Sequence, residues 1–159
     1  MPDLFSPIQI SGLTIPNRVV MAPTVKFCLH DGSGYVPDTL VEHYRLRAKS
    51  GTGLIIVEAT APNVGGKVHH KCLGLWEDGQ IEGLARIAKA IHDEGSKAIL
   101  QLCYTGVSSK DPAADSTSAS TNISTDARTC IYTFLQACPS FCHLFLSFIK
   151  VFSFLSTDR

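Results

Sequence analysis

Three short runs of aliphatic residues constrain most strongly how this chain can fold. They occupy residues 18–22 (RVVMA), 53–58 (GLIIVE) and 97–103 (KAILQLC), and Gly, Pro or Asn lies close to each run. Apolar residues fill these runs almost continuously, as in strands that are covered on both faces of a parallel sheet. We therefore expect three strands of one parallel sheet.

A first helical pattern lies between the first two runs. Thr39 and Glu42 follow Pro37-Asp38. At this spacing a hydroxyl and a carboxylate form a capping box, in which each accepts a hydrogen bond from a free backbone N–H. The pattern predicts a helix over residues 39–49, which Ser50-Gly51 ends because glycine readily adopts the backbone conformation that terminates helices.

A second helical pattern begins after Asp78 and ends at Gly95. Apolar residues recur there about every 3.6 positions, which predicts a face that covers a sheet. We expect this face to comprise Ile81, Leu84, Ala85, Ala88 and Ile91.

The resulting order of strand, helix, strand, helix and strand defines an α/β fold. Right-handed crossovers make all three strands parallel. The spacing alone fits either a barrel or an open doubly wound sheet. No GxGxxG sequence follows any of the runs, which argues against a dinucleotide-binding open sheet.

Charge and cysteine content exclude several classes of function. The chain of 159 residues has 14 basic and 14 acidic residues, so we expect no nucleic-acid partner. None of the six cysteines forms a CxxC pair, and His69-His70 lies in a predicted solvated connection, so we expect no metal site. The N-terminus carries no secretory signal pattern, which predicts a cytoplasmic protein with reduced cysteines.

Ligands of parallel α/β proteins bind at the carboxyl ends of the strands. Those ends here are residues 21–24 (MAPT), 58–60 (EAT) and 101–104 (QLCY). They offer small residues, backbone amides and the carboxamide of Gln101, a set that suits a flat heterocycle with edge donors and acceptors. The alternative is structural, with Gln101 capping one strand end and Pro23 terminating another.

Five motifs in the first 106 residues carry a family resemblance. They are residues 4–10 (LFSPIQI), 12–23 (GLTIPNRVVMAP), 54–59 (LIIVEA), 75–78 (LWED) and 101–102 (QL). In order and spacing they resemble the old yellow enzymes, flavin-dependent ene-reductases, and the likeness runs from Leu4 to about Gly106.

The resemblance implies a (β/α)8 TIM barrel, of which residues 1–106 would form about the first three β/α units. It implies FMN at the carboxyl face, NAD(P)H as reductant, and hydride transfer to an enone or similar activated alkene. Backbone groups of Pro23, Thr24, Val25 and Ala59 would then line the flavin, and Gln101 would hydrogen-bond its pyrimidine edge. No residue within this stretch corresponds to the family's substrate-holding or proton-donating residues, so we expect no ene reduction by the chain as given.

The sequence departs from the family pattern at several positions. Val25 stands where the family has a Thr or Cys that tunes the flavin, and Cys28 is three residues out of register with that role. Tyr104 and Val107 replace a His and an Arg. We interpret Cys28 as a packed or exposed thiol, and Phe27 lies near a position that often holds a substrate-contacting Tyr.

The composition changes after Gly106. Residues 107–129 are rich in Ser and Thr and read as a linker, whereas residues 130–159 are apolar and rich in Phe. Three interpretations of this unrelated tail stay open: translated non-coding sequence, a membrane-associating segment over residues 130–149, or a replacement cover on the half-barrel. A non-enzymatic truncated isoform that acts through this tail is the alternative to an oxidoreductase.

Overall fold

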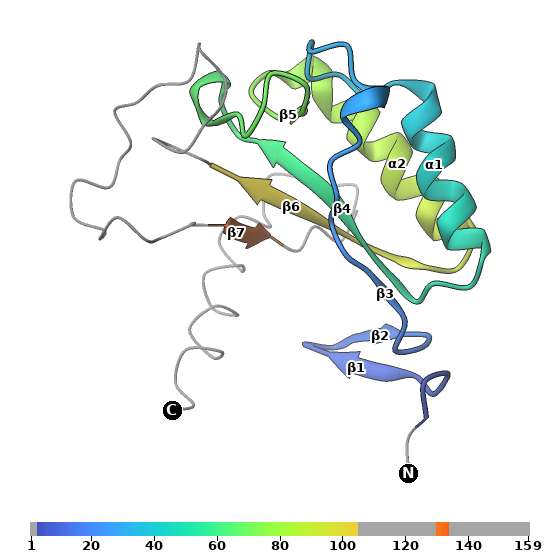
Figure 1. Cartoon of the computed structure of the whole chain (residues 1–159). Coiled ribbons are helices and arrows are strands. Elements are labelled where there is room, and N and C mark those ends of the chain that lie inside the picture. Colours follow the sequence, from blue (N-terminus) through green and yellow to red (C-terminus); the bar gives the residue numbers. More distant parts are fainter. Residues whose placement is uncertain (1–2, 105–129, 134–159) are drawn as a thin grey trace, which may run out of the picture.

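The computed structural model describes residues 3–104 and 130–133. A single sheet contains β3 (Val20–Met21), β4 (Leu54–Ala61), β6 (Lys97–Cys103) and β7 (Cys130–Thr133) in that order, and β5 (Leu73–Gly74) also pairs with β4. Helices α1 (Asp38–Lys49) and α2 (Ile81–Asp93) lie together on one side of the sheet (Figure 1). Three single-turn 3₁₀ helices, Phe27–Leu29, Val64–Gly66 and Asp78–Gln80, lie in the connections.

The three predicted strands are confirmed. Strand β3 pairs in parallel with β4, and β4 pairs in parallel with β6, so the sequence order of strand, helix, strand, helix and strand forms one α/β sheet. Strand β7 pairs with β6 in the antiparallel direction, with Gln101 opposite Tyr132. The sequence analysis did not predict β7, β5 or the N-terminal hairpin.

The capping-box prediction for α1 was wrong. The helix begins at Asp38 after Pro37, so Thr39 lies inside the first turn, and no side chain of the described residues caps the N-terminus. Proline sets the entry angle there, because its fixed φ suits a helix start. Ser50 ends α1, and Gly51 follows with φ of 90°, as the sequence predicts.

The predicted apolar face of α2 was partly wrong. Ile87 and Ile91 are the buried residues of the helix, whereas Ala85 is exposed. Ile87 lies four residues before Ile91 and therefore on the same helical face. The face that covers the sheet is thus rotated away from Ala85.

Two apolar clusters fill the two faces of the sheet. On the helix side, Ile55, Val57, Ala98 and Leu100 from the strands pack with core residues of both helices. On the other side, Ile15, Leu54 and Ile99 form a smaller cluster, with Ile8 and Ile56 packed against it. Since side chains alternate along a strand, Gln101 shares the second face with Ile99.

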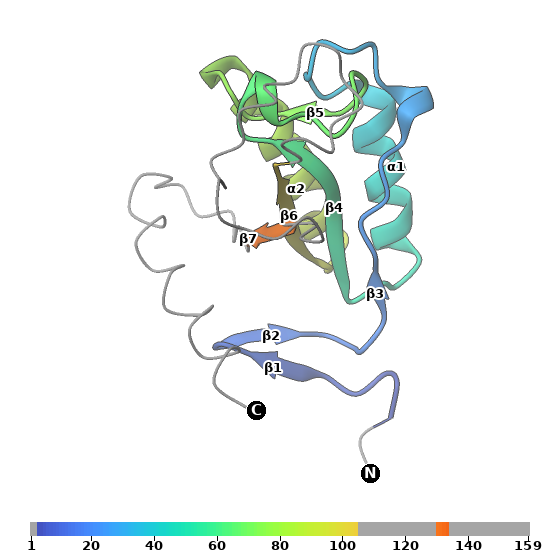
Figure 2. The same cartoon turned by 60° about the vertical axis from the view of Figure 1, so that its left-hand side comes forward.

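The smaller cluster includes residues of an N-terminal hairpin. Its strands are β1 (Ile8–Ile10) and β2 (Leu13–Ile15), and its two-residue turn has positive φ at both Ser11 and Gly12. Such a turn matches the twist of antiparallel strands. The hairpin lies at the end of the sheet where β4 begins (Figure 2), so it fills the second face near the amino ends of the strands. The carboxyl ends of that face are therefore left to other contacts.

Substituting Gly34 by alanine tests how closely the connections pack above the sheet. Gly34 has φ of 83°, and a Cβ there would lie 2.7 Å from Trp76 Cζ2 and 2.8 Å from Gln80 Nε2. Gly12 has nearly the same φ of 84° but open space around it. We expect Gly34→Ala to lower the free energy of unfolding by about 1–3 kcal/mol more than Gly12→Ala in urea denaturation. Both substitutions strain the backbone, but only the new methyl group at position 34 also overpacks its neighbours. Equal losses would contradict the packing around Trp76.

Candidate functional site

The carboxyl ends of three parallel strands meet at one edge of the sheet. Met21 lies opposite Ile55, which puts Pro23, two residues on, level with Val57. Val57 in turn lies opposite Leu100 of β6. The residues that the sequence analysis selected after each strand therefore lie at about the same level across the sheet.

A β-bulge in β4 decides which residues face the candidate site. Val57 lies opposite Leu100 and Thr60 lies opposite Leu102, so three steps along β4 match two along β6. The extra residue places Glu58 and Ala59 together opposite Gln101 in the strand register, as expected of a bulge. Because Leu102 packs with the helix-side cluster, Thr60 shares that side and Ala59 turns to the opposite face, beside Gln101.

Ala59 and Gln101 form the buried part of this candidate site. Ala59 is 9% exposed and Gln101 is 8% exposed. No hydrogen bond joins the Gln101 carboxamide to another of the described side chains. A buried carboxamide needs partners for both its donor and its acceptor, so Gln101 is suited to a ligand with an alternating polar edge.

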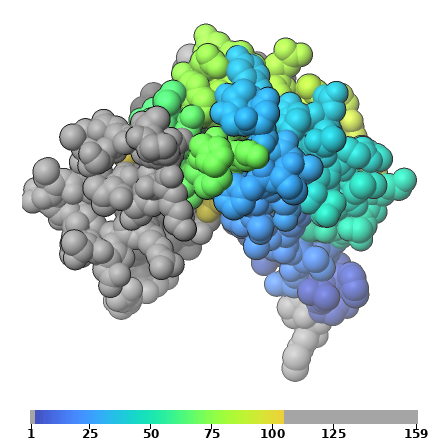
Figure 3. Space-filling view, turned by 45° about the horizontal axis from the view of Figure 1, so that its top comes forward, coloured from blue at the N-terminus to red at the C-terminus, as the bar shows by residue number. Residues whose placement is uncertain are grey.

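The segment after β3 supplies the remaining sequence-predicted residues. Pro23 and Val25 are half-buried, and Thr24 is exposed. This segment continues into the 3₁₀ helix Phe27–Leu29 and lies against the connection that follows β4, where the rings of Phe27 and His69 are 4.5 Å apart (Figure 3). The connections after β3 and β4 therefore meet above the sheet.

A buried polar cluster that was not predicted from the sequence surrounds Glu58. Its carboxylate is fully buried, and its Oε1 lies 2.5 Å from His30 Nε2. The backbone N–H of Lys26 donates to Oε2 at 3.2 Å, and the Tyr44 hydroxyl donates to the same oxygen at 3.4 Å. The backbone N–H of Glu58 donates back to the Tyr44 hydroxyl at 2.9 Å. These contacts join the segment after β3, helix α1 and strand β4.

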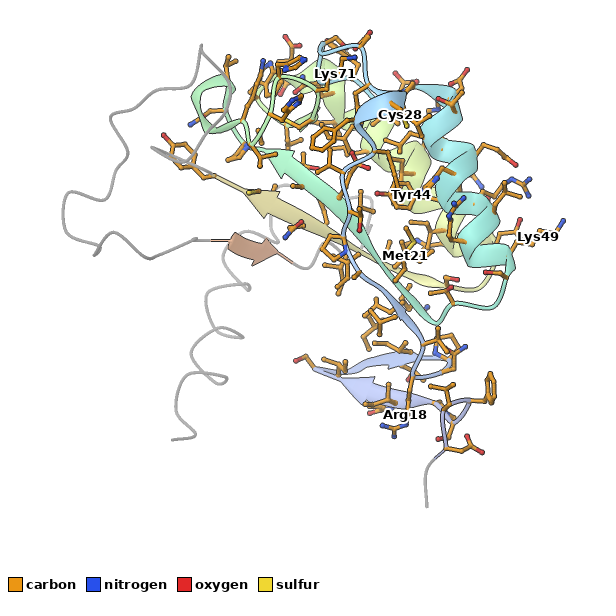
Figure 4. The ribbon with its side chains drawn as sticks, viewed as in Figure 1. Arg18, Met21, Cys28, Tyr44, Lys49 and Lys71 are labelled. Carbon is orange, nitrogen blue, oxygen red and sulfur yellow. The ribbon has the colours of Figure 1, made fainter. Side chains whose placement is uncertain are left out.

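Tyr44 stays protonated within this cluster. Its side chain points from α1 toward the sheet (Figure 4), and the residue is 1% exposed. Burial raises the pKa of the Tyr44 phenol far above its ordinary value, and the negative charge of Glu58 raises this pKa further. The phenol is therefore available as a hydrogen-bond donor to Glu58 throughout the physiological pH range.

The Leu75–Asp78 motif forms a packed corner above the sheet. The buried Gln80 side chain accepts a hydrogen bond from the Trp76 backbone N–H at 2.9 Å. The Lys67 ammonium lies 5.0 Å from the centre of the Trp76 ring, within cation–π range. The motif thus holds the connection between β5 and α2 in place.

Three other sequence expectations concern His69-His70, Cys28 and the region after Gly106. The centres of the two histidine rings lie 4.0 Å apart with the rings tilted by 35°, and no group of three potential ligands within residues 3–104 is arranged to hold a metal ion. Cys28 is an exposed free thiol. In the part of the chain that the structure describes, no helix has the length and apolar character to cross a membrane. The linker and all but Cys130–Thr133 of the 130–149 segment lie outside the described residues.

Comparisons with known proteins extend the sequence resemblance. A family model for the NADH:flavin oxidoreductase / NADH oxidase family matches residues 3–148, which continues past Gly106, where the quoted motifs end. The old yellow enzyme homologue from Zymomonas mobilis is 32% identical with a TM-score of 0.60, over 66% of this chain and 29% of that chain.

Two further solved structures show the same relationship. Morphinone reductase in complex with tetrahydroNAD is 35% identical with a TM-score of 0.60, over 69% of this chain and 29% of that chain. Old Yellow Enzyme from Pichia sp. is 28% identical with a TM-score of 0.64, over 68% of this chain and 28% of that chain. This chain spans about three tenths of the length of each of the three proteins.

These matches confirm the predicted family and the predicted α/β fold of the TIM-barrel type, although the described strands do not close a barrel. The family is FMN-dependent and uses a nicotinamide reductant. The sheet, its bulged strand β4 and the two covering helices are therefore parts of a flavoenzyme fold. The chain belongs to the NADH:flavin oxidoreductase / NADH oxidase family, which includes the old yellow enzymes.

Proposed function

We propose that this chain holds the ring of FMN at the carboxyl ends of β3, β4 and β6. Gln101 pairs with the pyrimidine edge of the ring, Ala59 packs beside it, and backbone groups of Pro23, Thr24 and Val25 line it. The observation that carries the proposal is the buried Gln101 carboxamide, which lies beside Ala59 of the β4 bulge on the face of the sheet away from the helices.

The residue types at this edge fit a flavin. A carboxamide both donates and accepts hydrogen bonds, as the alternating N–H and C=O groups of a pyrimidine edge require. The methyl group of Ala59 leaves room for a flat ring beside the strand. Val25 has no side-chain hydrogen-bonding group, so it contributes only packing and its backbone to the proposed site.

Bound FMN would supply hydride transfer from NAD(P)H to an activated alkene such as an enone. Within this chain, Gln101 would fix the orientation of the ring, and the segment after β3 would cover part of it. The chain spans about three tenths of the length of the related enzymes. We therefore propose cofactor binding for the described residues, and ene reduction for a whole protein that also supplies residues to hold the substrate and donate a proton.

A substitution at Gln101 tests this proposal. We expect Gln101→Leu to raise the Kd for FMN about tenfold or more, because it removes two hydrogen bonds of about 0.5–1.5 kcal/mol each while keeping a similar volume. The measurement is a titration of FMN fluorescence with the full chain, with urea denaturation in parallel to confirm folding. The matched control is Gln9→Leu, at an exposed position of β1. An unchanged Kd for Gln101→Leu would refute the assigned role.

A further inference from the structure

Glu58 connects the candidate flavin site to the rest of the fold. It is a fully buried carboxylate on the bulge of β4, next to Ala59. Burying a carboxylate costs free energy unless hydrogen bonds and opposite charges compensate for it. The partners that compensate here come from outside β4, so the position of Glu58 and the positions of its partners depend on each other.

Two of these partners lie on one segment. The backbone N–H of Lys26 donates to Glu58 Oε2 at 3.2 Å, and His30 Nε2 lies 2.5 Å from Oε1. Lys26 directly follows Val25, the last of the residues assigned to the flavin. The segment of residues 22–30 is therefore fastened to β4 by both oxygens of one side chain.

His30 depends on Glu58 for its orientation. The residue is 5% exposed, and its Nδ1 atom is buried with no hydrogen-bond partner among residues 3–104. Within the described part of the chain, the contact with Glu58 is thus the polar interaction that fixes this ring. On the opposite side, Tyr44 holds Glu58 from α1 through the bonds at 3.4 Å and 2.9 Å.

We propose that Glu58 is a positioning residue for the flavin site. It fastens residues 22–30 to β4 and thereby holds the backbone of Pro23, Thr24 and Val25 at the level of Ala59 and Gln101. The bulge makes this possible, because strict alternation after Val57 would direct Glu58 to the flavin face and Ala59 to the helices. The fastening of residues 22–30 rests on the contacts of Glu58 alone. Its effect on FMN affinity rests on the proposed function.

Two measurements on the full chain test the cause and the consequence separately. Hydrogen exchange reports whether the segment is fastened, through the Lys26 amide, which donates to Glu58, and the Leu29 amide, which donates to the Lys26 carbonyl at 2.8 Å. FMN titration reports whether this fastening matters for the cofactor. Glu58→Leu removes both acceptors of the carboxylate. We expect it to raise the exchange rates of the Lys26 and Leu29 amides about tenfold and to weaken FMN binding about tenfold, because hydrogen bonds to the carboxylate are lost. Glu58→Gln keeps an acceptor for Lys26 and should restore Lys26 protection.

Matched variants make the outcome decisive. Glu42→Gln, an exposed acid of α1 paired with Arg45, should leave both measurements unchanged. His30→Leu removes one link from the segment alone and should also raise Leu29 exchange, so it serves where Glu58→Leu does not fold. Exchange at wild-type rates in a folded Glu58→Leu or His30→Leu variant would overturn the proposal. Faster exchange with unchanged FMN affinity would overturn the positioning role. Failure of the wild-type chain to bind FMN would overturn the proposed function, and the exchange result would still test whether Glu58 fastens the segment.

Discussion

Replacing Leu40 by alanine is expected to lower the free energy of unfolding by about 2–5 kcal/mol. Leu40 lies on α1, is 0% exposed and belongs to the cluster that joins both helices to the sheet. Truncation removes apolar surface from the core and leaves a cavity that its rigid neighbours fill only in part. Urea denaturation of the full chain, followed by circular dichroism, measures this loss.

Leu46→Ala is the matched control for this prediction. Leu46 lies on the same helix but is 48% exposed, so its truncation removes few contacts and is expected to cost about 0.5 kcal/mol or less. The difference between the two variants therefore reports burial alone, since helix propensity changes equally in both. Similar losses for Leu40→Ala and Leu46→Ala would contradict the assignment of the covered face of α1.

The second large effect is expected at Ala59. Ala59→Phe places a phenyl ring on the face that Gln101 shares, where the proposed flavin ring packs, and we expect the Kd for FMN to rise about a hundredfold or more. The physical reason is steric, because a bound ring and the new side chain would compete for the same volume. Titration of FMN fluorescence with the full chain measures the change.

Two companion variants separate this effect from loss of folding. Ala59→Gly keeps the space open and should bind FMN within about threefold of wild type, corresponding to less than 1 kcal/mol. Ala85→Phe adds the same ring at an exposed position of α2 and should change neither stability nor affinity. If a folded Ala59→Phe variant binds FMN as wild type does, Ala59 does not face the cofactor.

The sequence predicted the parts of the fold that local patterns specify. Continuous aliphatic runs identified β3, β4 and β6, because strands covered on both faces need apolar side chains throughout. Ser50 and Gly51 identified the end of α1. The hairpin was not predicted because its strands have three residues each and half of these residues are exposed, although Ser11 and Gly12 suit its turn.

The errors arose where tertiary contacts override local preference. The residues around Thr39 fit a capping box, but Pro37 sets the helix start one residue earlier, and Asp38 then pairs with Arg86 of α2. In α2, the spacing of apolar residues predicts Ala85 on the buried face, whereas the larger Ile87 is the residue that is buried. Packing against a surface, which one helix alone does not reveal, decides between neighbouring faces.

The candidate site was predictable only in part. Pro23, Thr24, Val25, Ala59 and Gln101 followed from the resemblance and from the rule that ligands bind at strand ends; their roles stay predictions. The Glu58 cluster joins residues 14, 28 and 32 positions apart in the sequence. A single bulged residue in β4 brings them together, and no local pattern marks that bulge.

FMN binding at the carboxyl ends of β3, β4 and β6 is tested most directly by titrating the full, isotope-labelled chain with FMN and recording its amide resonances. We expect saturable shifts that cluster at Thr24, Val25, Ala59 and Gln101, the ends of three separate strands. Pro23 has no amide proton, so its neighbours report for it. Absence of shifts at millimolar FMN, or shifts confined to the β1–β2 hairpin at the other end of the sheet, would contradict FMN binding at these strand ends.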